Sequence, residues 1–98
     1  MTESSRKEFI AELKDKLDEA DERIDTLERK FEEASGDARQ EYRKRLDELR
    51  EQRERAGRKL QELRDAGDDS WQGIKDEAEQ VGKALRNSFN YFKSHFRD

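Results

Sequence analysis

Residues 27–46 read LERKFEEASGDARQEYRKRL, and this stretch decides the fold because it interrupts a regular apolar pattern at its centre. Gly36 suits the left-handed backbone that often follows the end of a helix. Asp37 suits the capping position before the next helix, with Gln40 three residues later. No proline in the chain forces a break elsewhere. We therefore expect one helix to end near residue 35 and a second to begin near residue 37.

On both sides of this break, apolar residues recur in alternating steps of three and four, which is the heptad repeat of a coiled coil. A capping box at Ser5 and Glu8 predicts that the first helix begins near residue 5, and the second is expected to end near residue 66. Folding the chain at Gly36 matches the two stripes in one register with only a short loop. In this register Ile10 meets Leu63 and Phe31 meets Tyr42. The expected hairpin core consists of Ile10, Leu13, Leu17, Ile24, Leu27 and Phe31 on the first helix and Tyr42, Leu46, Leu49, Leu60 and Leu63 on the second.

The charges of the two expected helices support this pairing. Residues 1–36 carry 7 basic and 12 acidic side chains, whereas residues 37–67 carry 10 basic and 8 acidic ones. Opposite net charges favour packing side by side, although each exposed pair contributes little. The alternative is a nearly continuous long helix that makes the same contacts with a second copy, as in a domain-swapped dimer.

A third amphipathic helix is expected over about residues 70–97. Its apolar stripe is Trp71, Ile74, Ala78, Val81, Leu85, Phe89, Phe92 and Phe96. From Ile74 onward the stripe repeats every eleven residues, which follows a nearly straight helix rather than a heptad supercoil. We therefore expect this helix to pack on the hairpin near Trp71 and then to diverge from it.

The predicted fold is all-α: an antiparallel coiled-coil hairpin over residues 1–67, with its turn near 35–37, followed by an aromatic-rich amphipathic helix over residues 68–98. The chain has 98 residues, of which 49% are charged and 30% hydrophobic. So short and polar a chain buries little apolar surface alone, and association of several copies would cover more of it. We therefore expect a homo-oligomer whose interface uses Trp71, Ile74, Val81, Leu85, Phe89, Phe92 and Phe96.

Residues 80–97 form a basic segment in an otherwise acidic protein of net charge -4. They hold four of the eight aromatic residues and no carboxylate. One interpretation is packing within a bundle, and a second is binding to an anionic membrane surface. The contacts for such a surface would be Lys83, Arg86, Lys93 and Arg97. Nucleic acid is a third partner, which the negative net charge and the lack of a motif disfavour.

Residues with catalytic or metal-binding chemistry are sparse. His95 is the one histidine and cysteine is absent, whereas metal sites and catalytic triads need several such groups together. The many carboxylates are typical of a solvated helix face. We therefore expect no enzyme activity, no cofactor, no metal and no small-molecule substrate. The sequence shows no signal peptide and no apolar run of membrane-spanning length, which favours a cytoplasmic location.

Residues 67–85, GDDSWQGIKDEAEQVGKAL, follow a charged helix that ends LQELRDAG, and residues 40–46 read QEYRKRL. Together these segments resemble small bacterial coiled-coil proteins associated with stress responses, over about residues 37–92. Ser70 stands where that pattern has alanine, and the phenylalanine-rich end departs from it. The resemblance implies a bacterial, cytoplasmic, stress-linked setting without catalysis or cofactors.

The function that the sequence favours is a non-catalytic, self-assembling structural or interaction protein, for which the resemblance implies a role in a stress response. The alternative is a peripheral membrane-surface protein that binds through its basic, aromatic C-terminal helix.

Overall fold

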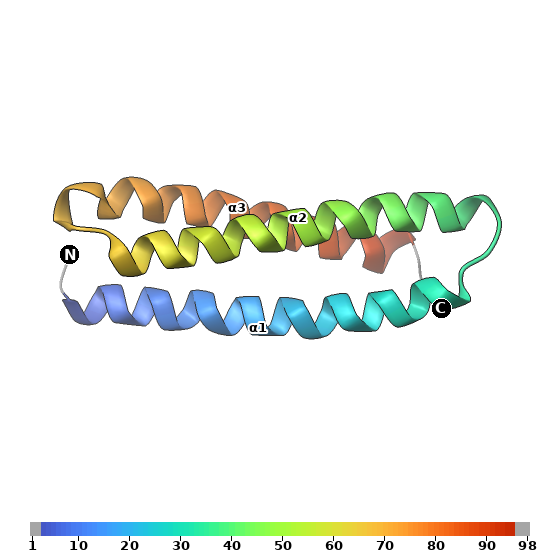
Figure 1. Cartoon of the computed structure of the whole chain (residues 1–98), viewed down its shortest axis with the longest axis horizontal. Coiled ribbons are helices and arrows are strands. Elements are labelled where there is room, and N and C mark those ends of the chain that lie inside the picture. The colour runs from blue at the N-terminus through green and yellow to red at the C-terminus, as the bar shows by residue number, and fades with distance from the viewer. Residues whose placement is uncertain (1–2, 96–98) are drawn as a thin grey trace.

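The computed structural model describes residues 3–95 as three long helices joined by two short connections (Figure 1). They are α1 (Glu3–Glu33), α2 (Asp37–Asp65) and α3 (Asp68–His95). Each connection reverses the chain, so α1 and α3 run in the same direction and both pack against α2. The rod measures 51 × 19 × 18 Å. No strand occurs in residues 3–95, and the predicted all-α fold with a helical hairpin is confirmed.

The turn between α1 and α2 lies where the sequence predicts it but is capped differently. Gly36 has a φ of 68° and is itself the cap of α2, whereas Asp37 is already helical and no side chain bonds the cap. The prediction of an Asp37 cap is therefore wrong. Arg39 instead donates from Nη1 to the carbonyls of Phe31 at 3.2 Å and Ala34 at 3.1 Å. The Phe31 carbonyl also accepts a hydrogen bond from the Ala34 N–H at 3.1 Å, so Arg39 adds a second bond there and a bond to the Ala34 carbonyl beyond the end of α1.

The predicted capping box at Ser5 is also wrong, because α1 already includes Glu3 and Ser5 is an interior helical residue.

The core runs along the inner faces of all three helices. Its buried residues are Leu13, Leu17, Ala20, Ile24, Tyr42, Leu46, Leu49, Ala56, Leu60, Leu63, Trp71, Ala78, Leu85 and Phe92. Ile10, Leu27 and Phe31 of the predicted hairpin core are half-buried and pack at its margin. The rings of Phe31 and Tyr42 lie 5.9 Å apart, in the register that the two stripes predict. The Tyr42 hydroxyl donates to the Leu27 carbonyl at 2.8 Å, so this buried phenol is satisfied.

Helix α3 follows the hairpin to its far end, so the expectation that it diverges beyond Trp71 is wrong. Its four buried residues, Trp71, Ala78, Leu85 and Phe92, are each seven positions apart, which is a heptad spacing. Near the turn between α1 and α2, Phe92 contacts Tyr42 with 5.0 Å between ring centroids. Phe89 falls outside this heptad and turns toward α1 instead, which explains why the whole apolar stripe suggests an eleven-residue period.

Candidate functional site

The seam between α1 and α2 is closed by opposite charges. Arg53 of α2 donates to Asp21 of α1 from Nε at 2.7 Å and from Nη2 at 3.0 Å. Nearer the turn, Arg50 Nη2 lies 2.6 Å from an oxygen of Glu28. On α1 both carboxylates directly follow a residue of the apolar stripe, which directs them toward α2. At these two positions, ion pairs therefore join this flank of α1 to α2.

The seam between α2 and α3 is closed in a similar way. Lys59 of α2 forms an ion pair with Glu77 of α3, and this hydrogen bond is the main cause that raises the pKa of Lys59. Farther along, the Ser88 hydroxyl donates to Gln52 Oε1 at 2.6 Å. These contacts join the two helices along their polar edge.

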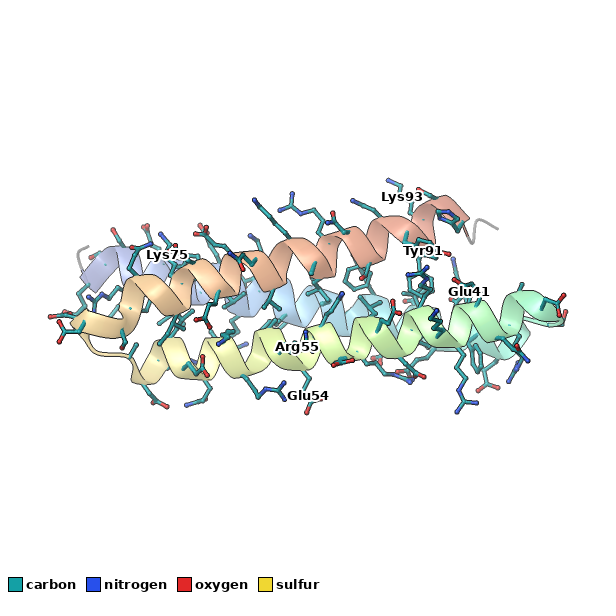
Figure 2. The ribbon with its side chains drawn as sticks, turned by 90° about the horizontal axis from the view of Figure 1, so that it is seen from above. Glu41, Glu54, Arg55, Lys75, Tyr91 and Lys93 are labelled. Atoms are coloured by element: carbon teal, nitrogen blue, oxygen red, sulfur yellow. The ribbon has the colours of Figure 1, made fainter. Side chains whose placement is uncertain are left out.

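Near the turn between α1 and α2, the same α2–α3 seam is held by Glu41 (Figure 2). Arg45 Nε donates to Glu41 Oε1 at 3.0 Å, and the Tyr91 hydroxyl donates to the same oxygen at 3.1 Å. The bond from Arg45, followed by the bond from Tyr91, lowers the pKa of Glu41. His95 stacks on the Tyr91 ring at 4.0 Å and is exposed, so the one histidine contacts an aromatic ring rather than a catalytic partner.

The seam between α1 and α3 is open, and cations line both of its walls. On α1 they occur every seven residues, each directly before a residue of the apolar stripe. On α3 three of the four belong to the basic segment over residues 80–97. The cations are Lys16, Arg23 and Lys30 on α1 and Lys75, Lys83, Arg86 and Lys93 on α3. Like charges on facing helices oppose close approach, whereas the other two seams pair opposite charges.

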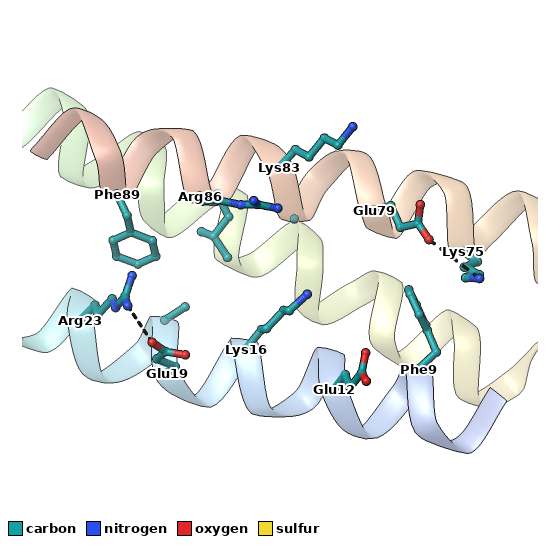
Figure 3. Close-up of a pocket in the computed structure, with 13 residues that line it drawn as sticks. Phe9, Glu12, Lys16, Glu19, Arg23, Lys75, Glu79, Lys83, Arg86 and Phe89 are labelled. Carbon is teal, nitrogen blue, oxygen red and sulfur yellow. Dashed lines mark hydrogen bonds and ion pairs between the residues drawn. The ribbon is translucent and has the colours of Figure 1, made fainter. Parts of the chain in front are cut away.

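A groove runs along this open seam (Figure 3). It has two sections, of about 690 Å³ and about 1020 Å³, which share Arg23, Arg86 and Phe89 and are therefore continuous. The first section begins at Phe9, and the second reaches Lys30 and Lys93. The apolar residues that line the groove between those ends are Ala20, Leu27, Leu85, Phe89 and Phe92.

Arg23 of α1 and Phe89 of α3 contact each other across the groove. Arg23 Nη2 donates to Glu19 at 2.7 Å, and its guanidinium lies 5.4 Å from the centre of the Phe89 ring. Figure 3 shows the Phe89 ring directed from α3 toward Arg23 on α1. Three other cations of the groove make no side-chain hydrogen bond or ion pair within residues 3–95: Lys16, Lys83 and Arg86.

The groove is closed at the end near the α2–α3 connection, where α1 and α3 do contact each other. The rings of Phe9 and Trp71 lie edge to face at 6.2 Å, and Arg6 Nη2 pairs with Asp68 at 2.7 Å. Lys75 Nζ lies 5.2 Å from the centre of the Phe9 ring. The open seam therefore extends from this anchor toward the other end of the rod.

The seven residues predicted for an oligomer interface differ in how far the single chain already buries them. Trp71, Leu85 and Phe92 are buried within the single chain, so contacts inside the chain already cover them. The half-buried members are Ile74, Val81 and Phe89, and of these only Phe89 lines the groove. Phe96 lies outside the described residues.

The predicted anionic-surface residues come together on one helix wall. Lys83, Arg86 and Lys93 are exposed and line the groove, whereas Arg97 lies outside the described residues. The matching cations on α1 were not predicted from the sequence. The available signal was the seven-residue spacing of Lys16, Arg23 and Lys30 along one flank of the first stripe.

Within residues 3–95, no three His, Asp or Glu side chains lie together in a way that could hold a metal ion. None of the three helices, over the same residues, is long and apolar enough to cross a bilayer. Comparison of the chain with family models, curated proteins and solved structures finds no match.

Proposed function

We propose that this protein is a non-catalytic interaction protein whose groove between α1 and α3 binds a helix. The observation that carries the proposal is the difference between the three seams. Two are closed by ion pairs such as Arg53–Asp21 and Lys59–Glu77. The third leaves the half-buried side chains of Leu27 and Phe89 accessible between two helices. Amphipathic helices bind such grooves by laying their apolar face into them.

The ionisable groups of the chain support a non-catalytic role. Among the described residues, the pKa values of Glu41, Arg45 and Lys59 are shifted, and all three groups belong to ion pairs that join helices or brace one helix. None of the three lines the groove. A stress-linked setting, implied by the family resemblance, remains part of the proposal.

Self-assembly through the α3 stripe has less support than binding of a partner helix. From its sequence, the apolar stripe of α3 is expected to be covered by a second copy of the chain. Trp71, Leu85 and Phe92 are 2%, 6% and 4% exposed in a single chain, so burial against α1 and α2 already removes them from water.

Two helical glycines of α3 offer a matched test of the groove. Added Cβ atoms at Gly82 and Gly73 would each meet nothing within 4 Å, so both positions accept a larger side chain. Gly82 lines the groove, whereas Gly73 is exposed and does not. Gly82→Leu should therefore block the groove, and Gly73→Leu should make the same chemical change without blocking it.

The probe is a fluorescein-labelled peptide of about 20 residues with leucines in heptad spacing and glutamines on the flanks, long enough to follow the groove as a helix. Fluorescence anisotropy should show binding to the wild type, a loss of about tenfold or more in affinity for Gly82→Leu, and little change for Gly73→Leu. Equal affinity for the two variants, or no binding to the wild type, would contradict the proposal.

A further inference from the structure

We infer that the partner of this groove is an acidic amphipathic helix of another protein, about 20 residues long. The inference rests on the proposed function and adds the chemistry of the partner. Its apolar face would cover Phe89 and Leu27, and its carboxylates would pair with the cations on the two walls.

The charge of the groove differs from the charge of the chain. Over the two sections, seven cationic and four acidic side chains line it, although the whole protein carries a net charge of -4. The imbalance is strongest in the section nearer the turn between α1 and α2, where Glu22 is the one carboxylate beside Arg23, Lys30, Arg86 and Lys93. An occupant with negative flanks is therefore complementary to both walls.

The length of the groove matches a helix of moderate size. On α1 it extends from Phe9 to Lys30, and on α3 from Lys75 to Lys93. At a rise of about 1.5 Å per residue, the α1 wall is roughly 30 Å long, which corresponds to about 20 residues of an occupying helix.

A second copy of this chain fits the groove poorly. Two copies that meet groove to groove would oppose one cation-lined surface with another, which is unfavourable. The acidic outer face of α1, which includes Asp15 and Asp18, has the required charge. However, the apolar stripe of α1 is directed into the core of its own chain and is not available to cover Phe89.

A membrane surface also fits the groove less well than a helix does. A peripheral helix binds lipid by inserting protruding apolar side chains into the boundary between headgroups and acyl chains. Of the apolar residues that line the groove, Leu85 and Phe92 are recessed, with 6% and 4% exposure. A convex helix can enter the space between two parallel helices, and a flat bilayer cannot.

The test compares three peptides of about 20 residues that share one leucine stripe and carry glutamate, glutamine or lysine on their flanks. The glutamate peptide should bind tightest and the lysine peptide weakest, with about a tenfold or larger difference in Kd between them. The affinity of the glutamate peptide should also fall as salt is raised, because salt screens exposed charges.

A pair of charge-matched variants locates the effect. Lys16→Glu/Lys83→Glu/Arg86→Glu reverses three groove cations and should weaken binding of the glutamate peptide about tenfold or more. Arg43→Glu/Lys44→Glu/Arg64→Glu reverses three exposed α2 cations that do not line the groove, and should leave the affinity nearly unchanged. Circular dichroism of both variants checks that each is folded.

Four outcomes overturn the inference. If the three peptides bind with equal affinity and Gly82→Leu still blocks their binding, the partner need not be acidic, but the proposed binding of a helix in the groove stands. If no peptide binds, both fail. If the wild type floats with phosphatidylglycerol vesicles and the variant with three reversed groove cations does not, the groove binds a lipid surface rather than a helix. If sedimentation equilibrium shows that the wild type is a dimer and that Gly82→Leu is a monomer, the groove binds a second copy of this chain.

Discussion

Glu41 shows how single residues fasten α3 to the hairpin. Its carboxylate accepts hydrogen bonds from the Arg45 guanidinium and the Tyr91 hydroxyl, and the guanidinium lies 4.2 Å from the centre of the Tyr91 ring. Both hydrogen bonds favour the charged carboxylate, which is why the pKa of Glu41 is lowered from its ordinary value of 4.5.

This shift predicts how the stability of the protein depends on pH. Because the pKa is lower in the folded state, the unfolded state binds more protons below pH 4.5. The stability that Glu41 contributes is therefore present above that pH and is lost as the pH falls through the folded-state pKa. In urea unfolding, Glu41→Gln should be less stable than the wild type at neutral pH, and the difference should shrink by about pH 3.

The control is Glu54→Gln, at an exposed residue of the same helix whose carboxylate lies 3.5 Å from Arg58. At neutral pH, Glu54→Gln should lower the free energy of unfolding by less than Glu41→Gln does. A difference for Glu41→Gln that is the same at both pH values would contradict the assigned role.

At the scale of the elements, the turn between α1 and α2 depends on Gly36. Its φ of 68° and ψ of -153° fall in a region that only glycine adopts readily. Gly36→Ala should lower the free energy of unfolding by about 1 to 3 kcal/mol. A Cβ at this position would meet nothing within 4 Å, so the loss would come from the backbone alone.

Gly73→Ala is the matched comparison, because Gly73 is helical and a Cβ there also meets open space. It should raise stability by up to about 1 kcal/mol. Denaturant unfolding gives the free energy of unfolding of both variants, to be compared with that of the wild type. An unchanged stability for Gly36→Ala would show that the turn tolerates another conformation.

The helices themselves were predictable because their apolar residues repeat with a strict period. The apolar stripe that includes Leu13 and Leu17 specifies which face of α1 is buried, and the stripe that includes Leu46 and Leu49 does so for α2. Together with the short loop, the two stripes also specify the register in which the helices pack. The capping contacts were not predictable, because Arg39 reaches the carbonyls of Phe31 in α1 and of Ala34 in the connection, and that depends on how the turn closes. The path of α3 was misjudged because Phe89 is apolar but contacts α1 rather than continuing the buried heptad.

At the scale of the whole molecule, the groove results from the order of the helices. Two reversals place α1 and α3 side by side on α2, and their like-charged flanks then lie across from each other. The sequence analysis could identify the α3 cations such as Arg86, since they lie in a segment without carboxylates. It could not assign Lys16 or Arg23, because these residues alternate with acids and their role depends on which flank of α1 is next to α3.

The central claim is that a partner helix lies between α1 and α3, and paramagnetic broadening tests it most directly. The chain has no cysteine, so Asn90→Cys and Glu54→Cys each give a single site for a nitroxide label. Asn90 lines the groove but its side chain is exposed, whereas Glu54 points away from α3 on the outer side of α2 (Figure 2). The label at position 90 should broaden the NMR signals of the bound glutamate-flanked peptide strongly, and the label at 54 should not. Equal broadening from both sites, or stronger broadening from position 54, would contradict the account.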